Sequence, residues 1–201
     1  MVGWGLGSAA LAAKVAARKV LVLGDSLSAE YGLPRGAGWV TLLQLKLAQE
    51  SPGTTVVNAS ISGETTAGGR SRLPALLKQH QPDLVVIELG GNDALRGLAL
   101  SMTHDNLAQM VRAAQASGAR VLLLGMQMPP NYGPEMTRQF AAMYSQLAKS
   151  QGTGLVPFFL HGVGDDAEPL KWFQPDRIHP NEAAQPRLLA NVWPQLKKQL
   201  K

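Results

Sequence analysis

Short apolar runs alternate along this chain with longer segments in which apolar residues recur every three or four positions. Runs that are apolar at nearly every position predict strands that are buried on both faces. These candidate strands are residues 20–23, 55–58, 84–89, 121–124 and 155–159. The helical period predicts helices between and after them. These candidate helices are residues 39–47, 72–80 (with Pro74 near the start), 107–114, 136–147 and 189–196.

Alternation of strands with helices is typical of βαβ crossovers and therefore of a parallel sheet. We predict an α/β fold, a three-layer α/β/α sandwich around a five-stranded parallel sheet. The pattern alone does not determine the strand order, but the flavodoxin-like order 2-1-3-4-5 fits a chain of this size. In such sheets ligands bind beyond the carboxyl ends of the strands, so functional residues are expected there.

The composition sets limits on this fold. The chain has 201 residues, of which 45% are hydrophobic and 16% are charged, which predicts one globular domain and excludes a disordered chain. We place this domain at residues 19–201 and treat residues 1–18 as an N-terminal tail. The absence of cysteine excludes disulfides and a thiolate nucleophile. No apolar run is long enough to span a bilayer, so we expect no integral membrane association.

The net charge of +5 comes from scattered lysines and arginines. A nucleic-acid-binding protein would gather such charge on one element, with aromatic residues between the basic ones. The densest basic cluster, Lys197, Lys198 and Lys201, fits a solvated helix end, where the helix dipole favours cations. We therefore expect no nucleic-acid partner.

The tail contains an uncharged, mostly apolar stretch over residues 2–13. Such a stretch, together with the small residues Ala10 and Ala12 around Leu11, is typical of a secretory signal peptide. The basic start of a signal peptide is missing. Two interpretations therefore stay open: a truncated export signal, or an N-terminal extension without a targeting role.

Residues suited to nucleophilic catalysis follow the predicted strands. Ser26 comes after the first strand, and Asp176 and His179 come after the fifth strand and a loop. A serine hydroxyl attacks a carbonyl only when a base takes its proton, and neutral imidazole does so near neutral pH. Asp176 precedes His179 by three residues, close enough to orient the imidazole across one turn. We predict that Ser26 is the nucleophile, His179 the base and Asp176 its orienting acid.

The negative oxygen that develops during such an attack needs hydrogen-bond donors held in place. The backbone N–H groups of Ser26 and Gly63 and the side-chain amide of Asn92 would supply three, an oxyanion hole beyond the first three strands. Glycine suits this position because a missing Cβ lets the backbone approach a substrate closely. No group of histidines and carboxylates has metal-ligand spacing, so we expect no metal and no cofactor.

Other residues compete for these roles. His161 is the alternative base because it follows the fifth strand, although no aspartate precedes it by three residues. Asp25 and Asp93 stand beside the nucleophile and the donor amide, and we interpret both as structural carboxylates in turns. The alternative for Ser26 is an ordinary turn residue that caps a helix.

Loops beyond the third and fourth strands are expected to set the depth of a substrate pocket. The predicted substrate-binding residues are Ala94, Leu95, Met128, Pro129 and Ile178. Methionine adapts to flexible acyl chains, which favours Met128 as part of a groove. The alternative is that Met128 and Pro129 pack in the core beneath a loop.

Together these residues resemble the SGNH, or GDSL, hydrolases, a family named for Ser, Gly, Asn and His in four sequence blocks. The blocks correspond here to Ser26, Gly63, Asn92 and His179, with Asp176 as the acid of the Asp-x-x-His block, and the resemblance covers about residues 19–200. The stretches VLVLGDSLSAEYGL, VVNASISGETTAGG and LVVIELGGNDALRG resemble the subgroup of bacterial thioesterase I, lysophospholipase L1 and arylesterase. GMQMPPNYG and IHPNEAAQPRLLANVWPQL point to the same subgroup.

The resemblance implies the SGNH hydrolase fold and a serine hydrolase of acyl-CoA thioesters, lysophospholipids and simple or aryl esters, acting through an acyl-enzyme. It also implies export to the periplasm or secretion, while the missing basic start leaves the cytoplasm as the alternative. The expected partners are small-molecule esters or thioesters, including lysophospholipid, and we expect a monomer.

Two other functions fit part of this sequence. A carbohydrate acetylesterase would use the same catalytic residues on the same fold. A non-catalytic, flavodoxin-like module would bind a phosphate-bearing cofactor through the Ser- and Thr-rich loop at residues 60–66. That module leaves the Asp176–His179 pair and the placement of Asn92 unexplained.

Overall fold

Five parallel strands form one sheet within residues 17–128 and 130–201, the part of the chain that the computed structural model describes. The strands are β1 Lys19–Gly24, β2 Thr55–Asn58, β3 Leu84–Glu88, β4 Arg120–Leu124 and β5 Gly154–Val156. Their order is β2-β1-β3-β4-β5, which confirms the predicted α/β class and the flavodoxin-like order. Because all neighbouring strands are parallel, their carboxyl ends lie at one end of the molecule.

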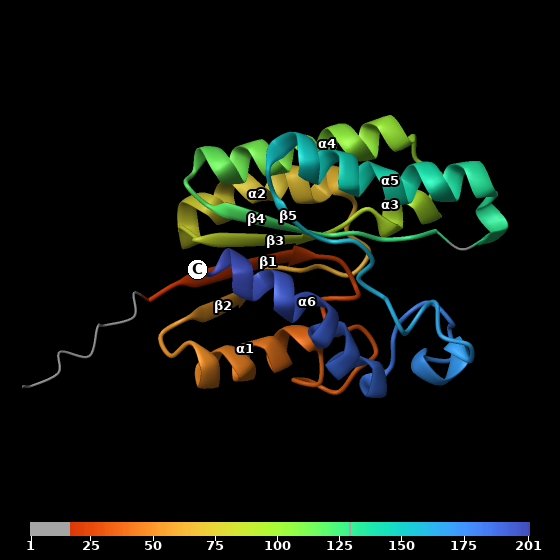
Figure 1. Ribbon diagram of the computed structural model, residues 1–201, viewed down its shortest axis with the longest axis horizontal. Coiled ribbons are helices and arrows are strands. Elements are labelled where there is room, and N and C mark those ends of the chain that lie inside the picture. Colours follow the sequence, from red (N-terminus) through yellow and green to blue (C-terminus); the bar gives the residue numbers. More distant parts are fainter. Residues whose placement is uncertain (1–16, 129) are drawn as a thin grey trace, which may run out of the picture.

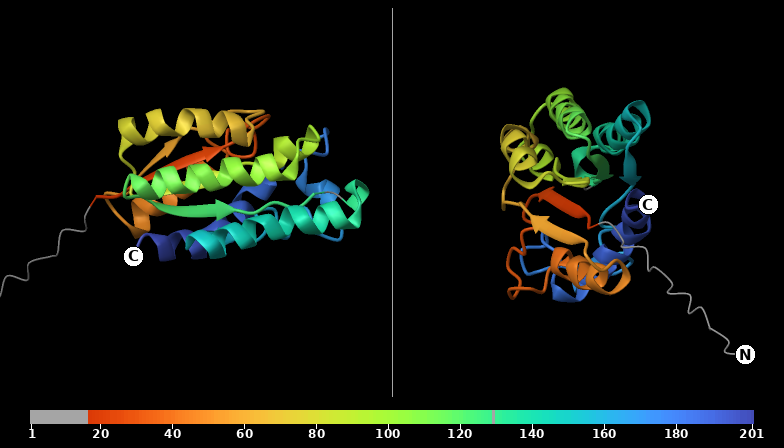
Figure 2. Two further views of the ribbon diagram at one scale, coloured as in Figure 1. Left: turned by 90° about the horizontal axis from the view of Figure 1, so that it is seen from above. Right: turned by 90° about the vertical axis from the view of Figure 1, so that its left-hand side faces the viewer.

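Helices cover both faces of the sheet (Figures 1 and 2). On one face α1 Trp39–Glu50 packs beside α6 Gln185–Gln199. The other face carries α2 Thr66–His80, α4 Leu100–Ala116 and α5 Pro134–Gln151. The shorter elements are α3 Gly91–Leu95 and the 3-10 turns η1 Pro130–Tyr132, η2 Pro169–Trp172 and η3 Glu182–Ala184. The arrangement is the predicted three-layer sandwich.

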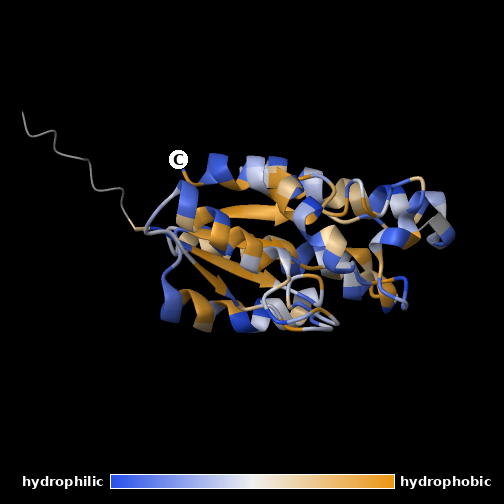
Figure 3. Ribbon diagram, turned by 90° about the horizontal axis from the view of Figure 1, so that it is seen from below, coloured by the Kyte–Doolittle hydropathy of each residue, from blue (hydrophilic) through white to orange (hydrophobic). Residues whose placement is uncertain are grey.

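Apolar side chains from both faces of the sheet make the core. In Figure 3 the strands carry mostly the colour of hydrophobic residues. Every side chain of β3 is buried, as a strand covered on both faces requires. The edge strand β2 is half-buried to exposed, since within the described part of the chain it has a neighbouring strand on one side only. Trp39 at the start of α1 packs edge-to-face on Phe159, with ring centroids 5.4 Å apart. This contact joins the helix layer to the loop that follows β5.

Several predicted boundaries are wrong; the helix predicted over residues 107–114, for example, spans Leu100–Ala116. The fifth strand, predicted over residues 155–159, ends at Val156, because Pro157 has no N–H to donate to the sheet. The second helix begins at Thr66 rather than at residue 72, so Pro74 lies inside it. Its start carries the polar segment Thr-Ala-Gly-Gly, which hides the helical period, whereas the Thr65 side chain caps it by accepting the Gly68 N–H.

The N-terminal tail predicted at residues 1–18 lies almost wholly outside the described residues, which begin at residue 17. No helix among the described residues is long and apolar enough to cross a membrane. The described domain starts with β1 and consists of the single sheet and its two layers of helices.

Candidate active site

The turn after β1 carries the predicted nucleophile. The chain leaves the sheet at Gly24 and turns tightly, with the Ala29 N–H donating to the Asp25 carbonyl (2.9 Å). Gly24 has no space for a side chain, because a Cβ there would lie 2.7 Å from Glu88 Oε2 and 2.8 Å from Ser28. This close approach places Ser26 half-buried at the carboxyl end of the sheet.

Three predicted catalytic side chains meet in hydrogen-bond contact. His179 Nε2 lies 2.9 Å from Ser26 Oγ, and His179 Nδ1 lies 2.7 Å from Asp176 Oδ2. The other oxygen of Asp176 accepts the N–H groups of Ile178 (2.9 Å) and His179 (3.0 Å). The backbone N–H of His179, that of Ile178 and the imidazole lower the pKa of Asp176 from 3.8 to about 2. Asp176 is therefore an anion throughout the neutral range.

The loop that presents His179 is held by residues that the sequence did not single out. Phe173 and Pro180 pair as an isolated antiparallel bridge. The Gln174 N–H donates to the His179 carbonyl (2.8 Å), and the Gln174 side chain donates to the Tyr31 carbonyl (2.8 Å). The Tyr31 ring lies 4.4 Å from the His179 ring. Neither Tyr31 nor Gln174 carries a sequence signal, because each is identified only by its contacts across the fold.

The three predicted oxyanion donors lie on segments that contact one another: Ser26 and Gly63 on loops and Asn92 in α3. Asn92 Nδ2 donates one hydrogen to Asp25 Oδ2 (2.9 Å), beside the nucleophile, and its second hydrogen remains available. Gly63 takes a positive φ of 79°, which glycine adopts without strain, and its carbonyl accepts from Arg96 (2.8 Å). Among the described residues, no acceptor contacts the N–H of Ser26 or of Gly63. All three groups are free to donate to a substrate oxygen.

The competing residues occupy other positions. His161 Nδ1 lies 2.8 Å from Asp165, whereas the imidazole that contacts Ser26 is that of His179. Asp93 is buried and accepts the N–H and the hydroxyl of Thr66, which ties α3 to the start of α2. The structure thus supports the structural interpretation of Asp93.

A family model for the GDSL-like lipase/acylhydrolase family matches residues 22–186. The chain belongs to this family. It is 56% identical to esterase TesA of Pseudomonas aeruginosa over 93% of this chain and 92% of that protein. It is 47% identical to thioesterase 1/protease 1/lysophospholipase L1 of Escherichia coli over 85% of this chain and 79% of that protein. A crystal structure of the psychrotrophic esterase EstA from a Pseudoalteromonas species, inhibited by monoethylphosphonate, matches with a TM-score of 0.84 and 40% identity. That match covers 91% of this chain and 98% of EstA.

The residues predicted to bind substrate in this GDSL hydrolase fall in different environments. Leu95 in α3 and Ile178 beside His179 are each 50% exposed, and Ala94 is half-buried two residues after Asn92. Met128 is only 8% exposed and belongs to the hydrophobic core, which agrees with the alternative that it packs in the core beneath a loop. Pro129 lies outside the described residues. Substrate contact by these residues stays a prediction.

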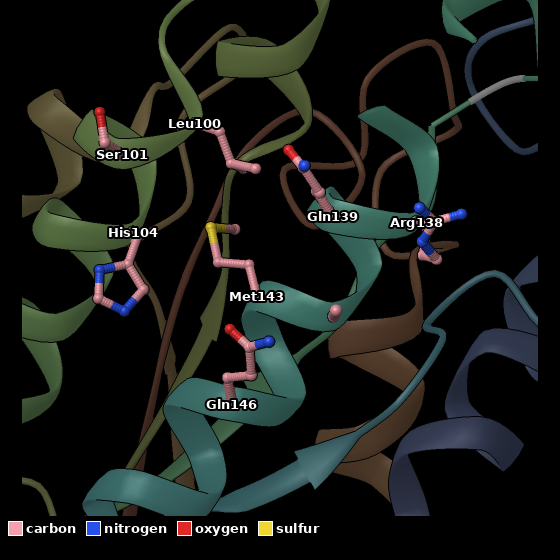
Figure 4. A pocket seen from close by; sticks show the side chains of 8 residues that line it. Leu100, Ser101, His104, Arg138, Gln139, Met143 and Gln146 are labelled. Atoms are coloured by element: carbon pink, nitrogen blue, oxygen red, sulfur yellow. The ribbon is translucent and has the colours of Figure 1, made fainter. Parts of the chain in front are cut away.

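A cavity of about 650 Å³ lies between α4 and α5 (Figure 4). Its lining combines the apolar side chains of Leu100 and Met143 with the polar ones of His104, Arg138 and Gln139. His104 contacts Asp105, and Arg138 pairs with Glu135, so both basic groups already have acidic partners. Among the described residues, the lining includes no predicted catalytic or substrate-binding residue.

Proposed function

We propose that this GDSL-family enzyme is a serine hydrolase that cleaves acyl esters and thioesters through an acyl-enzyme. The observation that carries the proposal is the contact of His179 with both Ser26 (2.9 Å) and Asp176 (2.7 Å). With Nδ1–H donating to the Asp176 carboxylate, Nε2 is free to accept the Ser26 proton. The arrangement supports nucleophile, base and orienting acid in their predicted roles.

Acylation follows from this geometry. Ser26 Oγ attacks the acyl carbonyl carbon while its proton passes to His179 Nε2. The carbonyl oxygen becomes an oxyanion, which accepts from the N–H groups of Ser26 and Gly63 and from the Asn92 amide. When the tetrahedral intermediate collapses, the bond to the leaving alkoxide or thiolate breaks, and His179 protonates that group. The acyl chain remains on Ser26 as an ester.

Deacylation repeats the same steps with water. His179 takes a proton from the water as its oxygen attacks the acyl-enzyme carbonyl. The same three donors hold the second oxyanion. Collapse returns the proton from His179 to Ser26 Oγ and releases the carboxylic acid. Both halves of the reaction thus use the same side chains, with the alcohol or thiol leaving in the first and water entering in the second.

We propose small-molecule acyl-CoA thioesters, lysophospholipids and aryl esters as the substrate class. The names of the relatives, an esterase and a thioesterase 1/lysophospholipase L1, support this range. The half-exposed apolar side chains of Leu95 and Ile178, close to Asn92 and His179 in the sequence, suit contact with an acyl chain.

Covalent labelling tests the proposal. A fluorophosphonate should add one phosphonyl group to Ser26, found by intact mass and peptide mapping, because only an activated serine reacts. The Ser26→Ala variant should remain folded, take up no label and lose about 10⁴-fold or more in kcat. Ser150→Ala, a serine in α5 whose hydroxyl donates to the Leu147 carbonyl, is the control and should behave as the wild type. Folded wild type without an adduct, or an active Ser26→Ala, would contradict the proposal.

We also propose that the domain of residues 19–201 is a monomer and that the protein is exported. The apolar stretch at residues 2–13 and the bacterial source of the relatives support export. Cell fractionation with N-terminal sequencing should place the enzyme in the periplasm with Ala13 as the first residue. An unprocessed chain in the cytoplasmic fraction would contradict export.

A further inference from the structure

Three carboxyl side chains are buried behind the catalytic serine. Asp25 is 3% exposed, Glu88 0% and Asp93 1%, and within residues 17–128 and 130–201 no lysine or arginine is buried with them. A buried carboxylate without a cation is unfavourable unless hydrogen bonds compensate or a proton neutralises it. Asp93 has the N–H and hydroxyl of Thr66 as donors. The burial of Asp25 and Glu88 needs a separate explanation. Both carboxyl groups lie against the turn after β1 that carries Ser26.

Glu88, at the carboxyl end of β3, has the environment of a neutral acid. Its Oε2 accepts the Ser28 hydroxyl (2.8 Å) and the Asp25 N–H (3.3 Å), while Oε1 has no hydrogen-bond partner in the described residues. Trp39 Nε1 in turn donates to Ser28 Oγ (3.1 Å). Burial, and next the neighbouring Asp25 charge, raise the pKa of Glu88 well above its ordinary value.

Asp25 has the environment of a carboxylate that only accepts. Its Oδ1 accepts the Leu27 N–H (3.0 Å), and its Oδ2 accepts the Asn92 amide (2.9 Å). Both oxygens therefore face N–H donors. A carboxylate cannot donate, so it fixes the Asn92 side chain with its nitrogen, not its oxygen, toward Asp25. The second hydrogen on that nitrogen is the one proposed to reach the oxyanion.

We propose that Asp25 and Glu88 form a buried carboxyl pair that holds one proton, on Glu88, and that the charge left on Asp25 positions the Asn92 amide for the oxyanion. The inference rests on the proposed function of Asn92 as an oxyanion-hole donor. Asp25 and Glu88 touch no reacting atom in this scheme, so both are positioning residues. Glu88 acts on Asp25 and on Ser28, and Asp25 acts on Asn92.

A single charge suits this place better than two or none. Two carboxylates under the oxyanion hole would oppose the negative charge that develops there. If both groups were neutral, a protonated Asp25 could donate to the Asn92 amide oxygen as well as accept from its nitrogen. The Asn92 side chain would then no longer be held in one orientation. The titratable groups that face the pair are His179 from the loop before α6, beside Asp25, and Tyr144 from α5, which also lies near Asp93 of α3. Burial raises the pKa of Asp25 from 3.8 to about 6, so the arrangement weakens as the pH falls below that value.

Asp25→Asn tests the role of the charge. In this variant an NH₂ group replaces one of the two accepting oxygens. It therefore faces another donor, either the Leu27 N–H or the Asn92 amide, and one of these two hydrogen bonds is lost. We expect kcat to fall about 30-fold or more with KM changed less than about threefold, since only the transition state uses the oxyanion donor. The rate at which a fluorophosphonate labels Ser26 should fall in parallel. Asp83→Asn is the matched control, because Asp83 also accepts a backbone N–H (from Lys19, 2.7 Å) but at the start of β3.

Glu88 variants test where the proton lies. Glu88→Leu removes the acceptor for the Ser28 hydroxyl and the Asp25 N–H, so we expect its kcat to fall about tenfold or more. Glu88→Gln keeps a neutral acceptor for both groups and should retain most of the wild-type kcat. Infrared spectra of the wild type at neutral pH should contain a protonated-carboxyl C=O band that is missing in Glu88→Gln. This band reports the proton itself, which a purely structural role would not change.

The outcomes separate this inference from the proposed function. Wild type that is folded but not labelled at Ser26 would overturn the proposed function. Wild type that is labelled, with Asp25→Asn labelled equally fast and equally active, would overturn the positioning role alone. An infrared band that persists in Glu88→Gln would overturn the assignment of the proton to Glu88.

Discussion

Several groups that we propose for catalysis are held in place by hydrogen bonds with neighbouring groups. Two backbone N–H groups hold the Asp176 carboxylate, Asp25 holds the Asn92 amide, and Arg96 holds the Gly63 carbonyl. Such contacts orient donors before the substrate arrives, so no reorganisation is needed during reaction. At this scale the chemistry depends on pairs of residues rather than on single ones.

Removing the Asn92 amide should separate catalysis from binding. Asn92→Ala is expected to lower kcat about 10²- to 10³-fold with KM within about threefold, because the donor contacts the oxyanion and not the ground-state carbonyl. Steady-state kinetics on an aryl ester would measure both constants. Asn191→Ala is the control, since Asn191 donates to the carbonyls of Phe159 and His161 instead. A higher KM with unchanged kcat would contradict the role.

At the scale of an element, backbone shape in the loop before α6 aligns Asp176 with His179. The backbone of Arg177 takes a positive φ of 60°. This left-handed conformation is common for glycine, less so for asparagine and aspartate, and rare for other residues. This turn lets Asp176 Oδ1 accept two successive N–H groups, those of Ile178 and His179. The Phe173–Pro180 bridge closes the loop on both sides.

Changing the shape of this turn should disturb the triad. A β-branched side chain tolerates the left-handed region less well than arginine does, so Arg177→Val should lower Tm by about 2 °C or more. We expect kcat to fall about tenfold as Asp176 and His179 lose their alignment. Arg177→Gly accepts the same φ and should keep the wild-type Tm and kcat. Equal values for the Val and Gly variants, from thermal unfolding and kinetics, would show that the turn has no such role.

At the scale of the whole molecule, the parallel sheet gathers its functional loops at one end. Residues that are separated by 153 positions, Ser26 and His179, meet there in one hydrogen bond. The same sheet buries Asp25 and Glu88 beneath them, where desolvation raises the pKa of both. The site therefore carries a cost in folding stability that depends on pH.

This cost has a defined sign. The pKa of Asp25 is raised from 3.8 to about 6, so the folded state binds this proton more tightly than the unfolded chain does. The stabilisation is complete below about pH 4 and is lost as pH rises through 6, a change on the order of 3 kcal/mol. The lowered pKa of Asp176, about 2, affects stability only at lower pH. Denaturant unfolding from pH 4 to 7 should show this fall in the wild type.

In the Asp25→Asn variant the fall should be smaller by the contribution of Asp25, while Glu88, whose pKa is also raised by burial, still contributes. Asp83→Asn should retain the full fall. A wild-type slope in Asp25→Asn would show that another group causes the pH dependence. Combined with the kinetics, the experiment would show whether the aspartate is kept at the expense of stability, as is common at functional sites.

Local sequence pattern by itself determined the fold class of this protein and predicted its candidate catalytic groups. Buried strands read as apolar runs because both faces are covered, and βαβ alternation then requires parallel neighbours. A candidate nucleophile, base and donors could be named because their residue types follow strand ends, as with Ser26 and Asn92. Their catalytic roles stay predictions. Boundaries failed where the pattern is weak, at the polar start of α2 and at Pro157.

Only the tertiary structure decided which residues support the site. Tyr31 on the His179 ring, Gln174 bridging two loops and Glu88 behind the nucleophile turn are defined by contacts between distant segments. A glutamate in the apolar run at residues 84–89 carries no sign in the sequence that it faces Asp25. Side-chain type and period are local properties, whereas hydrogen-bond partners and burial depend on how the strands are ordered and the loops packed. For that reason the sequence predicts the catalytic groups, and the fold determines how they are held.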